Sequence, residues 1–169
     1  TPLDLAKAVV LETGATIVAV PTTYSGSEMT GISGITRDGV KRTESSPAML
    51  PKLVIYDPQL TVALPKAATA GTGMNAVAHA VEATYVRAAN PLSTLHALAG
   101  VAALGQGLPA AIEAPDSLEA RSRALYGAYL AGLALGATGI ALHHKLCHVL
   151  GGSYGLGHGE VNAVVLPHA

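Results

Sequence analysis

The sequence of 169 residues contains no Phe, no Trp and a single cysteine, Cys147. Six Tyr are its only aromatic residues, so the core has to be filled by Ala, Leu, Val and Gly, a composition that favours helices in close contact. One cysteine excludes a disulfide within the chain. Because the opening residues also show no basic, apolar leader, we expect a protein of the reducing cytoplasm.

Charged residues are scarce as well, at 12% of the chain against roughly 25% in an ordinary soluble domain. The formal net charge of −1 excludes a basic nucleic-acid-binding protein and an acidic disordered tail. Half of the residues are hydrophobic, so the chain can fill a core but has few side chains with which to cover it. We therefore expect an internal piece of a larger protein.

Two stretches without any charged residue, 88–112 and 124–144, are long enough to span a bilayer. The first is interrupted by Asn, Gln, His and Pro, and the second contains several Gly and ends in two His. Neither has the unbroken Leu, Ile and Phe character of a lipid-facing helix. We expect no membrane association and interpret both as helices of a larger soluble core.

The first 60 residues combine helix and strand patterns. Apolar residues at helical spacing predict the first helix, and short β-branched runs ended by Pro predict buried strands. The dipeptide Asp38-Gly39 between two strand-like runs predicts a hairpin. The predicted elements are a helix at 3–12, a buried strand at 15–20, a further short strand at 53–56, and a hairpin at 32–43.

After about residue 60 the strand patterns stop, and helical periods of Ala, Leu and Gly continue to the last residue. This change predicts a domain boundary near residues 60–65, which divides the chain into 1–60 and 61–169. The predicted helices of the second part cover residues 74–88, 91–113, 117–135, 140–150 and 161–169.

The densest group of candidate functional residues is HHKLCH at 143–148, followed by His158. A spacing of four residues places His144 and His148 on one face of a helix. Four histidines in sixteen residues beside a Gly-rich turn resemble a metal or proton-transfer site more than isolated core histidines. Lys145 falls on an adjacent face, where it is either solvated or binds an anionic substrate.

A second group lies on one face of a predicted helix and consists of Asn75, His79 and Glu82. A carboxylate at position 75 would form a good ligand pair with His79 for a divalent metal, whereas Asn is neutral and a poorer ligand. An Ala-rich core helix with an incidental His explains the same pattern equally well.

A third group is the hydroxyl-rich segment PTTYSGSEMT at 21–30, which follows the first predicted strand. Nucleotides bind beyond the carboxyl ends of strands in open α/β sheets, so this segment is a candidate cofactor loop. An ordinary turn is the alternative. Neither GxGxxG nor GxxxxGK[ST] occurs in the sequence.

Together these motifs resemble the iron-containing (group III) alcohol dehydrogenase superfamily, and within it the maleylacetate reductase branch. The resemblance implies an α/β N-terminal piece followed by an all-α domain, in the dehydroquinate synthase-like or iron-containing alcohol dehydrogenase fold, incomplete at both ends. Residues 1–60 would be the C-terminal part of a nucleotide-binding domain and 61–169 the first part of a helical catalytic domain. The motifs that carry it are PTTYSGSEMT (21–30), VKRT (40–43), LVIYDP (53–58), GMNAVAHAVEATY (73–85) and HHKLCHVLGG (143–152).

The superfamily holds its metal between an Asp and a His of one helix and two later His. These positions fall on Asn75, His79, His144 and His158. Asn in place of Asp, and the form HHKLCH, resemble the maleylacetate reductase branch, which looks metal-independent. We therefore expect that no metal is required; if the enzyme is metal-dependent, these four residues would hold iron or zinc.

The resemblance implies reduction of the conjugated C=C bond of maleylacetate, a small dicarboxylate, to 3-oxoadipate by NADH or NADPH, in a full-length homodimer. Two alternatives stay open: a metal-dependent alcohol dehydrogenase and a non-catalytic fragment. Lys41 or Arg42 are further candidates for binding the substrate carboxylates. The predicted catalytic residues are His144, His148, His79 and Lys145, and the predicted cofactor-binding residues are Thr22, Thr23, Ser25, Gly26, Ser27 and Lys41.

Overall fold

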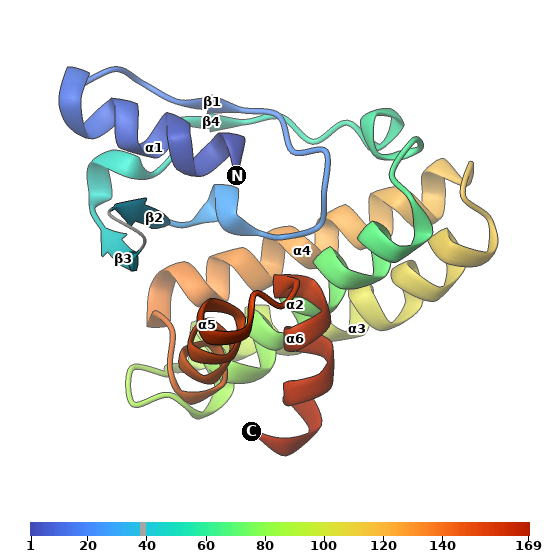
Figure 1. Cartoon of the computed structure of the whole chain (residues 1–169). Helices are drawn as coiled ribbons and strands as arrows, with labels where there is room; N and C mark the ends of the chain where they lie inside the picture. Colours follow the sequence, from blue (N-terminus) through green and yellow to red (C-terminus); the bar gives the residue numbers. More distant parts are fainter. Residues whose placement is uncertain (38–39) are drawn as a thin grey trace.

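The computed structural model describes the backbone of residues 1–37 and 40–169 and the side chains of residues 1–34 and 43–169. A small α/β part lies over a layer of long helices (Figure 1), which confirms the expected order of an α/β piece followed by helices. The helices are α1 (Pro2–Thr13), α2 (Lys66–Tyr85), α3 (Pro91–Glu113), α4 (Leu118–Thr138), α5 (Leu142–Tyr154) and α6 (His158–Val165). The strands are β1 (Val18–Ala19), β2 (Ile32–Arg37), β3 (Val40–Ser45) and β4 (Leu53–Val54), and short 3-10 helices are η1 (Ser27–Met29), η2 (Pro47–Met49), η3 (Pro58–Thr61) and η4 (Leu166–His168).

The α/β part consists of two small sheets and one helix. Strands β1 and β4 pair in parallel, and β2 and β3 form the predicted antiparallel hairpin, whose turn at Asp38-Gly39 lies outside the described residues. The expectation of a buried strand at 15–20 is wrong, because Val18 of β1 is 57% exposed, and its partner Leu53 on β4 is 52% exposed. Only one face of this sheet packs on a neighbour, where Ala19 joins Val10 of α1 in a small apolar cluster.

Helix α2 begins at Lys66, well before the expected start at Met74. The segment before Met74 contains Gly71 and Gly73, and glycine disfavours a helix in the absence of other contacts. Tertiary packing overrides this preference, because a Cβ at Gly73 would collide with the side chain of Leu108 on α3. These glycines let neighbouring helices approach α2 closely.

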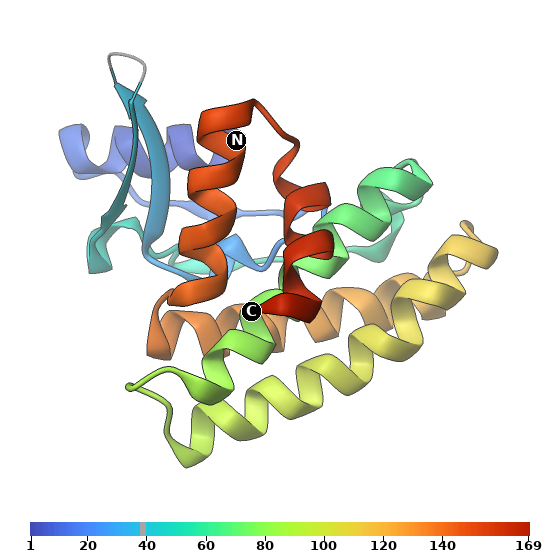
Figure 2. The same ribbon diagram turned by 60° about the horizontal axis from the view of Figure 1, so that its bottom comes forward.

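Helices α3 and α4 lie side by side, with α3 along the outer edge of the molecule (Figure 2). Their contact is lined by glycines: a Cβ at Gly107 would lie 2.6 Å from the backbone nitrogen of Ala124, and one at Gly127 would lie 2.7 Å from Leu104. The absence of Phe and Trp is thus matched by helix backbones that approach each other directly. The core cluster contains Tyr24, Ala76, Ala80, Ala83, Ala97, Leu104, Leu108, Ala124, Leu125, Ala128, Ala131 and Ala134.

By length and composition alone, α3 could cross a membrane, as could α4 and α5 if the two were one bent span. In the most apolar 18-residue stretch of α3, a third of the residues are buried inside the protein. The core helix of a soluble protein has the same composition, since it is apolar on more than one side.

Replacing Gly107 by alanine is expected to lower the free energy of unfolding by about 1–3 kcal/mol, because the added methyl group would push the α3 and α4 backbones apart. Gly105 on the same helix is a matched control: it is exposed, and a Cβ there would meet no atom within 4 Å. Gly105→Ala is expected to raise the same free energy by up to about 1 kcal/mol. Urea unfolding followed by circular dichroism measures both, and equal effects of the two variants would contradict this packing.

The chain reverses sharply after α4, where Gly139 adopts a positive φ of 77°. Helices α4 and α5 meet at an angle of 100°, so that α5 turns back and contacts α2. Helix α5 ends at Tyr154 and is followed by Gly155, which also has a positive φ. Helix α6 begins at His158, three residues before its expected start at Val161. Both α5 and α6 therefore lie against α2 (Figure 2).

Candidate active site

The loop that follows β1 runs along α2 and places two of the predicted groups next to each other. The backbone N–H of Tyr24 donates to Thr72 Oγ1 at 3.3 Å. One turn further on, Asn75 Nδ2 donates to the carbonyl oxygen of Ser25 at 3.4 Å and lies 3.3 Å from His79 Nε2. The predicted cofactor loop and the predicted metal helix are thus in direct contact.

The shape of this loop depends on small residues and on one buried lysine. Gly26 has a φ of 73°, and a Cβ there would lie 2.9 Å from the carbonyl oxygen of Ala128 on α4. A Cβ at Gly132 would collide with the carbonyl oxygen of Gly26. From α1, Lys7 Nζ donates to the carbonyl oxygens of Ser27 at 2.9 Å and Ile32 at 2.6 Å. The loop is therefore held from both sides.

The side chains predicted to bind the cofactor differ in their exposure. Thr22 is exposed, Thr23 and Ser25 are half-buried, and Gly26 is buried under α4. The hydroxyl of Ser27 lies 3.3 Å from Lys7 Nζ, so it is already engaged. The side chain of Lys41 and that of Arg42 lie outside the described residues.

Lys7 is fully buried, and burial lowers the pKa of its ammonium group to about 8, although the charges of Asp4 and Glu28 act in the opposite direction. A lysine of the unfolded chain keeps its ordinary pKa near 10.5, so between these values the unfolded state binds more protons. The free energy of unfolding contributed by Lys7 therefore rises as the pH rises from about 8 toward 10.

Lys7→Met is expected to lower the free energy of unfolding by about 1–3 kcal/mol at pH 7, because the buried carbonyl oxygens of Ser27 and Ile32 lose their donor. The difference in the free energy of unfolding between wild type and Lys7→Met is expected to widen between pH 7 and pH 9.5, since the variant lacks the ammonium group of Lys7. Urea unfolding at the two pH values measures it, and a gap that stays constant or narrows would show that Lys7 is not held as described.

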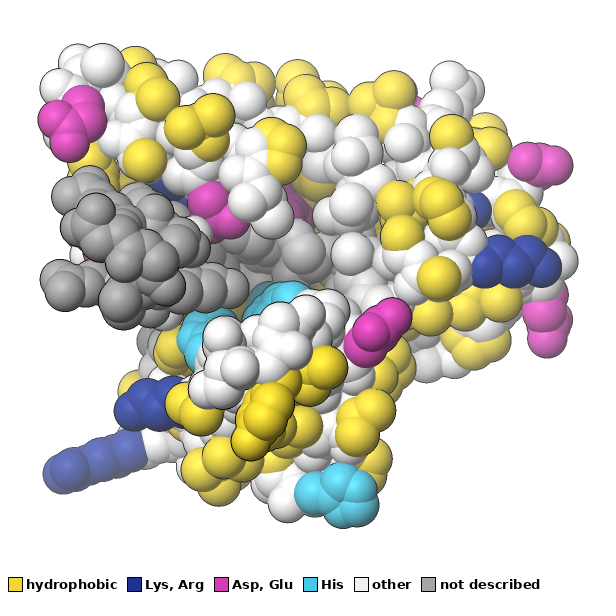
Figure 3. Space-filling model, in the orientation of Figure 1, with side chains coloured by type: hydrophobic (Ala, Val, Ile, Leu, Met, Phe, Trp, Pro, Cys, Tyr) yellow, Lys and Arg dark blue, Asp and Glu magenta, His cyan; other side chains and the backbone are white. Residues whose placement is uncertain are grey.

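The rings of four histidines from α2, α5 and α6 lie next to one another. His79 and His144 stack with centroids 4.6 Å apart, His144 and His148 lie 6.4 Å apart, and His148 and His158 lie 5.7 Å apart. His79 and His144 are buried, His148 is half-buried and His158 is exposed. In Figure 3, histidine side chains line the hollow between the α/β part and α5. These rings, hereafter the histidine row, lead from the interior to the surface.

Burial keeps His79, the inner end of the histidine row, uncharged. Burial, and next the neighbouring His144, hold the pKa of His79 well below its ordinary value. Burial also lowers the pKa of His143, whose Nε2 lies 2.8 Å from Asn162 Oδ1. Neutral imidazoles are the form that binds a metal or accepts a hydrogen bond. Cys147 packs against His143, and burial raises the pKa of its thiol, which makes it a packing residue rather than a nucleophile.

Glu82 is the residue to which the motifs assigned no role and which the structure places at the centre of the site. Its Oε2 lies 2.8 Å from Nδ1 of His144, and its Oε1 accepts the backbone N–H of the same residue at 3.3 Å. Burial alone would raise the pKa of Glu82, but the interactions with His144 and the backbone hydrogen bond of Ala141 together outweigh it and hold the pKa below its ordinary value. A fully buried carboxylate is thus ionised beside a histidine.

Several buried polar atoms of this cluster have no hydrogen-bond partner among the described residues. Among the described side chains, the buried atoms without a hydrogen-bond partner are Asn75 Oδ1, His79 Nδ1, His143 Nδ1 and His144 Nε2. Orphaned buried polar atoms are rare unless a ligand, ion or water satisfies them. No three His, Cys, Asp or Glu of the described residues are already grouped as ligands, so a metal here would also need the amide oxygen of Asn75.

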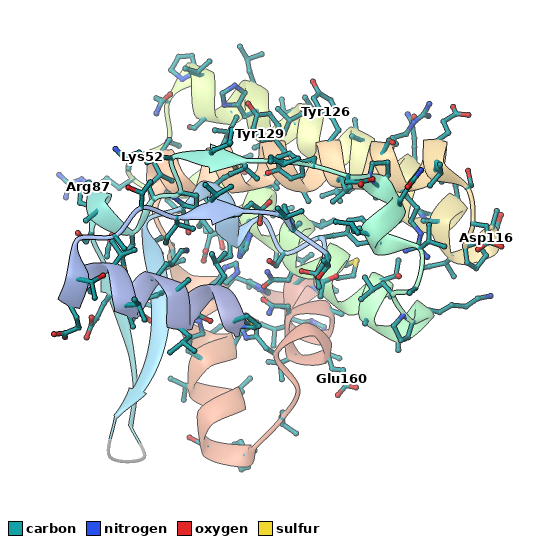
Figure 4. All side chains as sticks on the ribbon, turned by 90° about the horizontal axis from the view of Figure 1, so that it is seen from above. Lys52, Arg87, Asp116, Tyr126, Tyr129 and Glu160 are labelled. Carbon is teal, nitrogen blue, oxygen red and sulfur yellow. The ribbon has the colours of Figure 1, made fainter. Side chains whose placement is uncertain are left out.

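Lys145 is exposed on α5, and its contact with a substrate stays a prediction. A second hollow of about 220 Å³ lies on the far side of α4 and is lined mainly by tyrosines and Leu125. Figure 4 shows Tyr126 and Tyr129 side by side there, with ring centroids 6.4 Å apart. This hollow offers hydroxyl groups but none of the histidines, so the histidine row is the candidate active site.

Comparison with known proteins identifies the class to which this arrangement belongs. Residues 69–169 match the Fe-containing alcohol dehydrogenase family, C-terminal, and residues 1–58 match iron-containing alcohol dehydrogenase. The chain therefore belongs to the iron-containing alcohol dehydrogenase family, as its motifs predicted.

Individual relatives are more specific. Maleylacetate reductase 2 of Cupriavidus pinatubonensis is 52% identical over 98% of this chain and 46% of its own length. The crystal structure of maleylacetate reductase from Agrobacterium tumefaciens matches with a TM-score of 0.95 and 51% identity, over 98% of this chain and 47% of that one. The iron-containing alcohol dehydrogenase of Corynebacterium glutamicum has a TM-score of 0.94 and 44% identity, over 98% and 46%. The chain thus spans about half the length of these relatives.

Family membership corrects the expectation that no metal is required. A family of iron-containing enzymes implies iron as well as NAD(P)H, so that expectation is wrong. It relied on Asn75 being a neutral ligand, but Asn75 Oδ1 is buried and unpartnered, on an amide group whose Nδ2 lies 3.3 Å from His79 Nε2. Oxygen and imidazole donors in one place can bind a divalent ion without the carboxylate.

Proposed function

We propose that this chain forms part of an NAD(P)H-dependent maleylacetate reductase, which reduces the conjugated C=C bond of a small dicarboxylate to give 3-oxoadipate. The observation that carries the proposal is the contact of the 21–30 loop with Asn75, which in turn contacts His79, because it brings a candidate cofactor loop close to the histidine row. Relatives named maleylacetate reductase, about half identical to this chain, support the substrate. The proposed location is the cytoplasm, and the proposed full-length form is a homodimer.

The proposed roles of the site residues follow from their contacts. Bound NAD(P)H would supply a hydride to the alkene carbon β to the ketone, and bound iron would supply a Lewis acid near the ketone oxygen. Asn75, His79, His144 and His158 would hold the iron. Ser25 and Gly26 offer backbone groups, and Thr22 and Thr23 offer hydroxyls, for the ribose or phosphates of the cofactor.

The second step needs a proton on the carbon α to the ketone. His148 is the best placed donor, because it is half-buried between His144 and the exposed His158. An imidazole in this position can give a proton to carbon and regain one from solvent. Lys145, with Lys41 or Arg42 of the hairpin, would bind the substrate carboxylates.

The direct test uses the full-length protein, with oxidation of NADH and NADPH followed by absorbance. Maleylacetate is expected to be reduced much faster than simple alcohols are oxidised with NAD⁺ or NADP⁺. A chelator is expected to lower this activity and added iron to restore it. Oxidation of simple alcohols at a far higher rate than reduction of maleylacetate would favour the second candidate, a metal-dependent alcohol dehydrogenase. The iron-containing relatives support this candidate. Loss of both activities would leave a non-catalytic chain.

Asn75→Asp is expected to increase the affinity for iron or zinc by at least about tenfold, because a carboxylate adds a negative charge against the dication. Titration of the metal-free protein with Zn²⁺, followed by calorimetry, measures this affinity. Asn90→Asp is the control, since Asn90 caps the first turn of α3 and Asp is an equally good capping residue. Equal metal affinity of wild type and Asn75→Asp would show that position 75 does not contact the metal.

A further inference from the structure

The cofactor loop at 21–30 is anchored near its middle by its one aromatic side chain, Tyr24. The loop leaves the small sheet after β1 and crosses α2 and α4 (Figure 1). Tyr24 is fully buried, and its ring is part of the main core cluster, to which α2 and α4 also contribute. Its neighbours Thr23 and Ser25 are half-buried and are proposed to contact the cofactor. The place of the Tyr24 ring therefore determines where these two residues lie.

The hydroxyl group of Tyr24 is held from two sides. It donates its proton to Thr61 Oγ1 of η3 at 3.0 Å, and Thr61 in turn donates to the carbonyl oxygen of Pro58. Because a phenol has only one proton to donate, Tyr24 Oη is the acceptor in its contact of 3.0 Å with Arg121 Nη1. A shift of the ring would lengthen both hydrogen bonds, the one to η3 and the one to α4.

Arg121 is a buried cation whose hydrogen-bond partners are neutral groups. It is 1% exposed, and its guanidinium group donates to Tyr24, to Thr69 and to two backbone carbonyl oxygens. None of the ion pairs of the described residues includes Arg121. Burial of a charge without a counter-ion is costly, and an apolar side chain would fill the same space without that cost. The guanidinium group instead offers five N–H donors in a fixed plane, which can hold separate segments in register.

We propose that Arg121 is a positioning residue, which sets the cofactor loop through the hydroxyl group of Tyr24 and thereby determines the affinity for NAD(P)H. The proposal rests on the proposed function, in which the 21–30 loop binds the cofactor. Thr69 of α2 accepts from the same nitrogen, Nη1, at 3.1 Å, so Arg121 holds the loop in register with the helix that carries His79. Binding groups that are held in place before the ligand arrives cost less to order on binding.

Two conservative variants each remove one acceptor of Arg121 Nη1 and so form a matched pair. Tyr24→Phe removes the hydroxyl group that belongs to the loop, and Thr69→Val removes the one that belongs to α2. Both are expected to lower the midpoint of urea unfolding of the full-length protein. Only Tyr24→Phe is expected to weaken NADH and NADPH binding, by about tenfold, the equivalent of roughly one hydrogen bond between loop and cofactor. Fluorescence titration measures this affinity.

Two further measurements separate positioning from a general loss of structure. Steady-state kinetics of Tyr24→Phe are expected to show a KM for NADH raised by a similar factor and a kcat close to that of wild type, because the histidine row is unchanged. Hydrogen exchange reads the loop without any cofactor. The backbone N–H of residue 24, which donates to Thr72 Oγ1, is expected to exchange faster in Tyr24→Phe than in Thr69→Val when both are compared with amides of α3.

Equal NADH affinity of wild type and folded Tyr24→Phe would overturn the proposal, as would an equal loss of affinity in Thr69→Val. If Tyr24→Phe does not fold, Thr61→Val, which removes the acceptor of the Tyr24 proton, takes its place. It is expected to weaken NADH binding too, and unchanged affinity there would also overturn the proposal. A wild-type protein that binds NADH but does not reduce maleylacetate would refute the proposed function alone, since the binding and exchange measurements use no maleylacetate.

Discussion

His144→Ala in the full-length protein is expected to lower the turnover of maleylacetate by about a hundredfold or more, the usual effect of removing a positioned donor or ligand at a reacting centre. His144 touches both the buried end of the histidine row and Glu82, so the variant also removes the partner of a buried carboxylate. The affinity for NAD(P)H is expected to change little, because Lys7 and Gly26 hold the cofactor loop without His144.

Steady-state kinetics with maleylacetate and fluorescence titration with NADH measure the two quantities. His148→Ala is expected to show a similar loss of turnover, since His148 is the proposed proton donor. His168→Ala is the control, because His168 is exposed in η4. Turnover close to wild type in both His144→Ala and His148→Ala would refute the assigned roles.

Arg121→Ala is expected to lower the free energy of unfolding by about 3 kcal/mol or more. Arg121 is 1% exposed, and its guanidinium group donates to Tyr24 Oη at 3.0 Å and Thr69 Oγ1 at 3.1 Å. It also donates to the carbonyl oxygens of Pro115 and Val62. Alanine would leave a cavity and several buried acceptors without donors, each of which costs about 1–3 kcal/mol.

Arg123 offers a matched control on the same helix. It forms an exposed ion pair with Glu119, and such pairs contribute at most about 1 kcal/mol. Urea unfolding of Arg121→Ala and Arg123→Ala, followed by circular dichroism, is expected to show a large loss in the first variant only. Similar losses in the two would mean that the buried network does not stabilise the fold as its contacts indicate.

Local patterns were sufficient to predict most elements. The bounds of α3 were predicted correctly, because Asn90 caps its first turn and Pro91 occupies the first helical position. The start of α2 was missed, since Gly71 and Gly73 disfavour a helix in isolation, and only packing against Gly159 and Leu108 explains why they occur in one. The buried strand expected at 15–20 was wrong because an apolar run does not reveal whether both of its faces are covered.

The site was predictable where its residues are neighbours on one helix. The four-residue spacings correctly placed His144 with His148 and Asn75 with His79. The pairing of Glu82 with His144 spans 62 residues, and that of Arg121 with Tyr24 spans 97, so no local spacing indicates either. Buried charged residues such as Lys7 resemble surface residues in a sequence, and only the acceptors around them show otherwise.

The 100° bend between α4 and α5 also sets the order in which the site forms during synthesis. When the ribosome has made α2, the chain already contains Asn75, His79 and Glu82, but His144 follows 62 residues later. At about 5–20 residues per second, this delay is roughly 3–12 seconds. During that time Glu82 is a carboxylate on an apolar helix without its partner. Docking of α5 brings His144 to Glu82, and the proposed ligand His158 follows only with α6, so a nascent chain cannot complete the proposed ligand set before both helices have docked on α2.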